Sequence, residues 1–313
     1  MNRALVFPGQ GSQAVGMGQA LAGSFAEARE VFQEIDDALG QHLTKLIFEG
    51  PEGDLKLTEN AQPALMAVSM AVIRVLDKQG NFRLPDAAKF VAGHSLGEYS
   101  ALCAAGSFSV ADAAKLLKTR GMAMQKAVPV GIGAMAALIG VDLPAAQEIA
   151  EAAAQGEVCT AANDNAPGQV VISGHVGAVD RAIAIAAERG FKRSVKLPVS
   201  APFHCSLMQP AADVMQKALA DIAIKAPVVP VVANVTAEAV NDAAKIRELL
   251  VKQVTGSVRW RESVLYMKAK GVEQLVECGA GSVLAGLARR IDKELASVSL
   301  QAPADIENFL KSV

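Results

Sequence analysis

The segment Gly93-His94-Ser95-Leu96-Gly97 sets a hydroxyl nucleophile between glycines. It follows a short apolar run, 89–92, and opens a stretch of helical composition, so it matches the strand–turn–helix context of a nucleophile elbow. Such a turn strains the serine backbone and needs the clearance that glycine gives. The Ser95 hydroxyl then lies near the positive end of a helix, where the amide of Leu96 can face a developing oxyanion. The pattern predicts nucleophilic acyl chemistry, against the alternative of a glycine-rich turn with an incidental serine.

A serine nucleophile needs a base, and the chain offers 4 histidines. His204 is favoured because it lies in a proline-stiffened loop, 198–205, directly after a predicted strand, and strand-end loops often carry catalytic groups. A cysteine enzyme using Cys205 is the rival interpretation. It is disfavoured because Cys205 lacks an elbow, and neighbouring side chains in extended chain point apart.

The group that would orient the base is not evident. Hydrolases with an elbow place an acid between serine and histidine in chain order. Asp142, Asp164 and Asp180 lie in that interval, but none follows a strand of the main sheet in an obvious motif. A backbone carbonyl or an amide side chain could do the same work, and the sequence leaves this choice open.

Two further segments bear on the site. The loop 7–13 formally matches a dinucleotide fingerprint through Gly9 and Gly11, but the chain after it has a helical pattern where that motif needs a strand ending in an acid. We expect instead a close-approach loop in which the Gln10 amide is a second oxyanion donor. Arg120 lies late in a helix capped by Ser109, and an arginine directed at the serine would bind a carboxylate bidentately. The competing role for Arg120 is a solvated helix face.

The elements around these residues alternate between β-rich runs and Ala-rich helical stretches, which predicts an α/β fold with a short parallel sheet. The expected strands of the main unit are 3–7, 89–92, 228–234 and 272–277, and its expected helices are 25–39, 63–79, 97–105, 110–127, 246–253 and 283–291. The section 128–197 has a different order of predicted elements. These are strand 134–141, a helix begun by Pro144, strands 157–162 and 169–173 around a turn at 163–168, helix 178–189 and strand 192–197. This βαββαβ order predicts a ferredoxin-like unit inserted between 1–127 and 198–313.

Composition limits the partners. The chain has 313 residues, 51% hydrophobic and 20% charged, with a net charge of −2. No polybasic run is present, so we expect no nucleic-acid or membrane partner. The 4 cysteines form no CxxC pair, which disfavours a zinc site and fits a reducing compartment. With no signal-peptide pattern and no apolar run of about 18 residues, we expect a cytoplasmic protein that needs neither metal nor cofactor and can act as a monomer.

Taken together, the motifs resemble malonyl-CoA:acyl carrier protein transacylases and, more broadly, the acyltransferase domains of fatty-acid and polyketide synthases. The resemblance spans nearly the whole chain in the family's order. The matching pieces are 7–13, 62–64, 93–98, Arg120-Gly121 with Met124, 163–174, His204, Gln253 and 258–260.

The resemblance implies a role for each matching residue. Ser95 would carry the malonyl group as an ester, His204 would be its general base and acid, and the main-chain carbonyl of Gln253 would take the place of a triad acid. The oxyanion hole would use the amides of Gln10 and Leu96, and Arg120 would hold the malonyl carboxylate. The implied substrate-binding residues further comprise Gln62, His94, Met124, Asn165 and Phe203.

The family further implies an α/β-hydrolase-like core with a ferredoxin-like insertion. Its substrates would be malonyl-CoA and holo acyl carrier protein, in the service of fatty-acid synthesis. Phe203 precedes the base, where a bulky ring would crowd an α-methyl branch, so malonyl should be preferred over methylmalonyl. The alternatives are a serine esterase or thioesterase on the same core, which needs a triad acid and an apolar acyl pocket, and a non-catalytic carrier-docking module.

Overall fold

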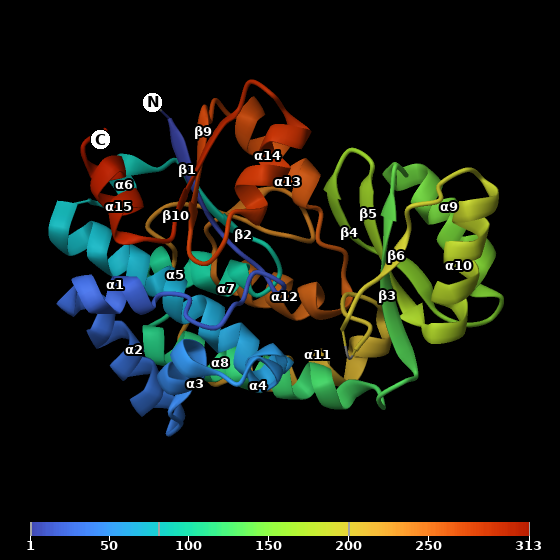
Figure 1. Ribbon diagram of the computed structural model, residues 1–313, viewed down its shortest axis with the longest axis horizontal. Helices are drawn as coiled ribbons and strands as arrows, with labels where there is room; N and C mark the ends of the chain where they lie inside the picture. The colour runs from blue at the N-terminus through green and yellow to red at the C-terminus, as the bar shows by residue number, and fades with distance from the viewer. Residues whose placement is uncertain (1, 81, 200, 313) are drawn as a thin grey trace.

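The computed structural model describes residues 2–80, 82–199 and 201–312. Two units lie side by side in Figure 1, a larger one that contains both ends of the described chain and a smaller one built from its middle. The larger unit is organised on a six-stranded sheet in the order β10-β9-β1-β2-β7-β8. Its strands are β1 (Arg3–Phe7), β2 (Phe90–Gly93), β7 (Val231–Val232), β8 (Ala239–Val240), β9 (Gln274–Cys278) and β10 (Ala296–Leu300).

The central strands of this sheet run parallel, and only β8 pairs antiparallel, with β7. Both faces of β1 are buried: Leu5 and Phe7 pack into one apolar core, and Ala4 and Val6 into another on the opposite face. A parallel sheet needs cover on both faces, which explains the nearly continuous apolar strand sequences.

Helices provide that cover. Those of the larger unit are α1 (Gln19–Ser24), α2 (Ala26–Leu39), α3 (Leu43–Glu49), α4 (Glu52–Lys56), α5 (Thr58–Gly80), α6 (Leu84–Ala87), α7 (Gly97–Ala104), α8 (Val110–Ala127), α11 (Gln209–Ala220), α12 (Ala243–Thr255), α13 (Trp260–Ala269), α14 (Val283–Ile291) and α15 (Pro303–Leu310), with a 3-10 turn η1 at Ser206–Met208. Helix α8 begins where the sequence predicts, because the Ser109 side chain accepts a hydrogen bond from the Asp112 N–H.

The smaller unit has the predicted βαββαβ order: β3 (Gly133–Ile139), α9 (Leu143–Ala154), β4 (Cys159–Ala166), β5 (Gln169–His175), α10 (Val176–Glu188) and β6 (Val195–Lys196). Its four strands lie in the order β4-β5-β3-β6, with antiparallel pairing throughout. In Figure 1, α9 and α10 cover one face of this sheet. The core between them is a separate apolar cluster.

Several predicted boundaries are wrong for identifiable reasons. The expected turn at 163–168 is strand for most of its length, because β4 continues to Ala166 through two irregularities in register and only Pro167-Gly168 turn the chain. The expected strand 228–234 shortens to β7, since Pro230 has no N–H for the ladder. The expected strand 192–197 keeps only β6. Strand β10 and helix α11 had no predicted counterpart.

The two units are joined at the β4 strand. Asn163 forms an isolated β-bridge with Val258, and the Asp164 carboxylate, which is buried, accepts two hydrogen bonds from Arg261 Nε at 2.9 and 3.1 Å. The segment 256–261 of the larger unit is therefore fixed to the smaller unit. In the described residues, no helix is both long and apolar enough to cross a membrane.

Candidate active site

The serine lies on a strained turn between β2 and α7. Ser95 has a φ of 54°, in the left-handed region that non-glycine residues rarely adopt. Two hydrogen bonds from one side chain fix this turn: Asn234 Oδ1 accepts from the Ser95 N–H at 2.8 Å, and Asn234 Nδ2 donates to the Gly93 carbonyl at 2.7 Å. The predicted elbow is therefore present and held on both sides of the serine.

The flanking glycines are required by close backbone contacts. A Cβ on Gly93 would lie 1.9 Å from the carbonyl of Gly97, and one on Gly97 would lie 2.3 Å from the Phe7 oxygen. The loop after β1 approaches the turn as well, since a Cβ on Gly9 would lie 2.8 Å from the His94 oxygen. These contacts support the interpretation of 7–13 as a close-approach loop, and the helix α2 that follows excludes the dinucleotide pattern.

His204 is bonded to the serine. Its Nε2 lies 2.7 Å from Ser95 Oγ, and its Nδ1 lies 2.9 Å from the Gln253 carbonyl and 3.1 Å from the Gly256 carbonyl. Because carbonyl oxygens only accept, Nδ1 must carry the proton, which leaves Nε2 of the neutral ring free to accept from the serine hydroxyl. This is the arrangement of a general base whose orientation depends on backbone carbonyls.

The electrostatic setting keeps that base neutral. Burial, together with the nearby Arg120 cation, lowers the pKa of His204 to about 3, although its two carbonyl partners act in the opposite direction. Burial likewise lowers the pKa of His94. Both imidazoles therefore remain uncharged at neutral pH.

The three aspartates considered in the sequence as partners of the base are engaged elsewhere. Asp142 accepts from Ala145 N–H at the start of α9, Asp164 pairs with Arg261, and Asp180 pairs with Lys196 at 2.7 Å. None of the three is bonded to His204. The open choice in the sequence is thus resolved in favour of backbone carbonyls.

Arg120 is buried in the site and does not lie on a solvated helix face. It is 1% exposed, and its Nη2 donates to Ser95 Oγ at 3.2 Å and to Gln253 Oε1 at 2.8 Å, while Nη1 donates to Gln62 Oε1 at 2.9 Å. Gly121 allows this placement, since a Cβ there would lie 2.6 Å from the Thr58 oxygen at the start of α5. A buried guanidinium beside a hydroxyl has the chemistry to bind a carboxylate bidentately.

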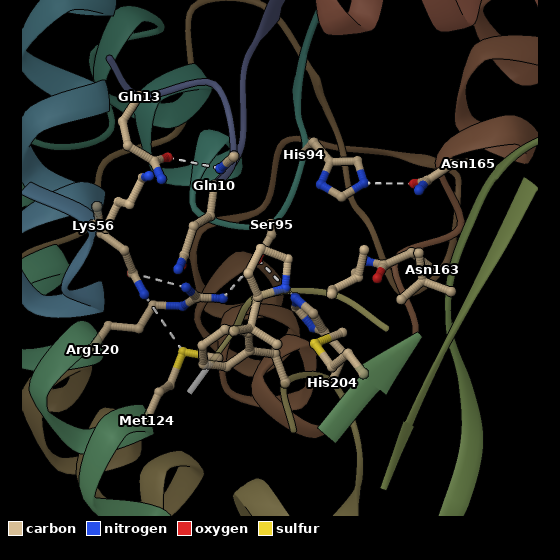
Figure 2. A pocket seen from close by; sticks show the side chains of 18 residues that line it. Gln10, Gln13, Lys56, His94, Ser95, Arg120, Met124, Asn163, Asn165 and His204 are labelled. Atoms are coloured by element: carbon tan, nitrogen blue, oxygen red, sulfur yellow. Dashed lines mark hydrogen bonds between the residues drawn. The ribbon is translucent and has the colours of Figure 1, made fainter. Parts of the chain in front are cut away.

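These groups line one cavity of about 420 Å³, which runs between the two units. Figure 2 shows Arg120, Ser95 and His204 converging there, with Met124 below and the Asn165 side chain on the far wall. The remaining predicted residues that line it are Gln10, Gln62, His94 and Phe203. His94 Nε2 lies 2.8 Å from Asn165 Oδ1, a bond that joins the elbow to the smaller unit.

Leu96 and Gln253 stand behind the cavity wall. Leu96 is 1% exposed and immediately precedes α7, so its amide lies at the N-terminus of that helix. Gln253 is fully buried and contributes through both its backbone oxygen and its side chain. The structure thus brings all the predicted site residues to one place.

Two residues that hold the site together were given no role in the sequence analysis. Asn234 holds the elbow, and Glu98 accepts from the Asn234 N–H at 3.1 Å and from Gln253 Nε2 at 2.8 Å. A signal existed for each: Asn234 closes a predicted strand, and Glu98 is a carboxylate in the first turn of an otherwise mostly apolar helix. Lys56 also lines the cavity and carried no recognisable pattern.

Among the described residues, no cluster of histidine, cysteine, aspartate or glutamate side chains has a metal-binding arrangement. The residues that meet at Ser95 instead form a serine, a neutral histidine and an arginine around one cavity. These are the groups that nucleophilic acyl chemistry through a serine ester requires.

Comparison with known proteins identifies the family. The family described as "Acyl transferase domain" matches residues 4–304, so the chain belongs to it. The chain is 48% identical over 301 residues to the malonyl CoA-acyl carrier protein transacylase of Escherichia coli K12, covering 96% of both chains. It is 43% identical over 311 residues to the protein of that name in Bacillus subtilis, covering 99% of this chain and 96% of the relative.

Solved structures agree with the sequence relatives. The acyl-carrier-protein-S-malonyltransferase of Bartonella henselae superimposes with a TM-score of 0.98 at 54% identity, covering 100% of this chain and 99% of the other. A malonyl-transacylase solved in complex with a type II PKS acyl-carrier protein has a TM-score of 0.97 at 42% identity, with 100% of both chains covered. The resemblance inferred from the motifs is confirmed.

Proposed function

We propose that this protein transfers the malonyl group from malonyl-CoA to the phosphopantetheine thiol of holo acyl carrier protein, through an ester on Ser95. The observation that carries the proposal is the buried Arg120, whose Nη2 lies 3.2 Å from Ser95 Oγ. A cation so close to the nucleophile favours an acyl group that ends in a carboxylate. The names of the transacylase relatives, and the carrier-protein complex of one of them, support both substrates.

The first half-reaction begins at the Ser95–His204 hydrogen bond. Oγ attacks the thioester carbonyl as its proton passes to His204 Nε2. In the imidazolium that forms, Nδ1 keeps its proton and stays hydrogen-bonded to the Gln253 and Gly256 carbonyls. The C–S bond then breaks, and the departing CoA sulfur takes the proton from Nε2. Malonyl-Ser95 and CoA-SH are the products, and His204 is again a neutral base.

The second half-reaction reverses this path with the carrier thiol. His204 takes the thiol proton, the thiolate attacks the serine ester, and Ser95 leaves with the proton from Nε2. Exchange between two thioesters is nearly neutral in free energy, so a covalent relay is sufficient. No metal or cofactor takes part in the proposal.

The remaining roles are also proposals. The Leu96 amide precedes α7, where the helix dipole favours negative charge, and with the Gln10 amide it would stabilise the oxyanion of each tetrahedral intermediate. Phe203 lines the cavity beside the base, where its ring would disfavour an α-methyl branch. Gln62, Met124, Asn165 and His94 would shape the acyl pocket.

A serine esterase or thioesterase is the alternative, and the site disfavours it. Its expected marks are a triad acid and an apolar acyl pocket. Here His204 Nδ1 is bonded to two carbonyls, and a buried arginine stands beside the serine. A non-catalytic docking module is disfavoured by the intact serine, base and cation.

Intact-protein mass measurements test the proposal. Brief incubation with malonyl-CoA should add one malonyl group to the wild type and none to Ser95→Ala, and holo carrier protein should then remove the group and gain it. Rapid loss of the adduct to water, with no labelled carrier, would instead establish the hydrolase. Absence of any adduct would refute the malonyl assignment.

The finer architecture and the cellular setting complete the proposal. We infer an α/β-hydrolase-like core, 1–127 and 198–313, with a ferredoxin-like insertion at 128–197, supported by the parallel sheet and by the strand order β4-β5-β3-β6.

The four cysteines are buried and free, which fits a cytoplasmic location. A monomer without a nucleic-acid or membrane partner is proposed, and light scattering of the purified chain would test its mass.

A further inference from the structure

The buried carboxylate of Glu98 has no part in the reaction described above. It lies in the first turn of α7 and is 2% exposed. One of its oxygens, Oε2, accepts both from Gln253 Nε2 at 2.8 Å and from the Asn234 N–H at 3.1 Å. Glu98 therefore contacts two residues that themselves hold the serine, the base and the arginine.

Gln253 connects Glu98 to Arg120 through an amide that has two different ends. Its Nε2 donates to Glu98 and, at 2.9 Å, to the Ser95 carbonyl, while its Oε1 accepts from Arg120 Nη2 at 2.8 Å. A guanidinium only donates, so the amide must present oxygen to it. In the reverse orientation, an NH₂ group would face the arginine, and the hydrogen bonds of the amide to Arg120 and to Glu98 would both be lost.

We propose that Glu98 is a positioning residue: by accepting from Gln253 Nε2, it holds the amide with its oxygen toward Arg120 and so sets the selectivity for acyl groups that carry a carboxylate. The inference rests on the proposed function, since it concerns the arginine that would bind the malonyl carboxylate. Glu98 acts through Gln253 and touches no reacting atom.

The effect on selectivity differs from the effect on the base. His204 is held by the backbone carbonyl of Gln253, which belongs to α12 and does not turn when the side-chain amide turns. A turned amide would also lose its bond to the Ser95 carbonyl, but Asn234 still fixes the elbow and the Gln253 backbone still holds His204. Loss of the Glu98 contact should therefore disturb Arg120 more than the Ser95–His204 pair. Transfer of a neutral acyl group should then be affected much less than transfer of malonyl.

Protonation of Glu98 does not remove the contact. Burial raises the pKa of Glu98 to about 7, against hydrogen bonds from Gln253 and Asn234 and the charge of Arg120. Both donors bond to Oε2, so a proton would reside on the other oxygen. Oε2 accepts in either state, and the amide orientation is kept across neutral pH.

Two substitutions separate contact from charge. Glu98→Asp keeps the carboxylate but withdraws it by one methylene from Gln253, whereas Glu98→Gln keeps an oxygen acceptor at the same reach without the charge. Acylation of Ser95 by malonyl-CoA and by acetyl-CoA, followed by quenched-flow mass measurement, gives the ratio of the two kcat/KM values. This ratio does not depend on the fraction of folded enzyme.

For Glu98→Asp we expect malonyl acylation to fall about 10- to 100-fold, the range for losing a hydrogen bond to a charged group, and acetyl acylation to fall no more than about threefold. Glu98→Gln should keep the ratio within about threefold of the wild type. The matched control is Glu277→Asp, a fully buried carboxylate that accepts from two α14 amides away from the cavity. Its malonyl-to-acetyl ratio should not change.

An equal fall for both acyl groups in Glu98→Asp would overturn the inference, because it would show a purely structural role. The same loss of selectivity in Glu98→Gln would also overturn it, since charge rather than orientation would then matter. If the wild type takes no malonyl group, the proposed function fails. A crystal structure of Glu98→Asp still decides the inference, which requires Gln253 Oε1 to leave Arg120.

Discussion

The state of the base leads to a pH prediction that is opposite to the usual expectation for histidine. Burial and Arg120 lower the pKa of His204 to about 3. An ordinary histidine, with a pKa of about 6.5, is only about 3% neutral at pH 5, whereas a group with a pKa near 3 is about 99% neutral there. Acylation of Ser95 should therefore keep nearly its full rate from pH 8 down to pH 5, instead of falling about 30-fold.

The assay should report the free enzyme and avoid ionisations of the substrate. Values of kcat/KM describe the free enzyme, and a malonyl thioester of pantetheine lacks the phosphates of CoA. Because the pKa of Glu98 is raised to about 7, this carboxyl could add its own inflection to the pH profile of kcat/KM. Such an inflection would be absent from the profile of Glu98→Gln. If kcat/KM fell with a midpoint near pH 6.5 in both the wild type and Glu98→Gln, the reasoning would be refuted, because His204 would then have an unperturbed pKa.

The same pKa shift has a consequence for stability. His204 has a pKa of about 3 in the folded state and about 6.5 in the unfolded chain, so between these pH values only the unfolded chain binds the proton. The contribution of His204 to the free energy of unfolding is therefore present above pH 6.5 and is lost as the pH falls toward 3. Between pH 8 and pH 5, about 1.5 pH units at about 1.4 kcal/mol each amount to about 2 kcal/mol. Urea unfolding of the wild type and His204→Gln at both pH values measures this difference, and an equal pH dependence in the two proteins would contradict it.

Three further predictions concern the cavity and the elbow. Arg120→Ala should lower malonyl acylation about 100-fold or more and acetyl acylation far less, as judged by quenched-flow kinetics, and equal losses would refute the carboxylate clamp. Wild type should prefer malonyl-CoA to methylmalonyl-CoA, and Phe203→Ala should narrow that preference in a competition assay; comparable wild-type rates would refute the steric role. Gly97→Ala, with its Cβ 2.3 Å from the Phe7 oxygen, should lower the free energy of unfolding by about 3 kcal/mol or more, whereas Gly286→Ala, in open space on α14, should change it by about 1 kcal/mol or less in urea titrations.

The local signals in the sequence were sufficient for the elements that carry chemistry. Glycines at 93 and 97 around Ser95 predicted the elbow because the motif lies between an apolar run and a helical stretch. Alternation of apolar runs and helical stretches predicted the parallel sheet and the βαββαβ unit. Each of these predictions used a local sequence pattern, either the spacing of a short motif or the period of a single element.

What the sequence could not supply was pairing across long separations. The Gln253 carbonyl meets His204 only after α12 has packed beside the elbow, and Asn234 reaches Gly93 across 141 positions. The bridge of Asn163 to Val258 likewise joins residues that are far apart in the chain. Polar residues at such junctions have no periodic pattern, so their partners become evident only when the fold has brought them together.

In the proposed mechanism, the neutral character of the group that orients His204 is consistent with an anionic substrate. Arg120 Nη2 lies 2.8 Å from Gln253 Oε1, and the backbone oxygen of the same residue accepts a hydrogen bond from His204 Nδ1. A carboxylate in place of that carbonyl would pair with Arg120 or repel the incoming malonyl group, and either effect would weaken binding. The Gln253 amide does contact a carboxylate, but this is Glu98, which bonds to Nε2 and not to the Oε1 that faces Arg120. The amide thus separates the arginine from its counter-charge and leaves the guanidinium available to the substrate, so a backbone carbonyl suits this reaction better than a triad acid.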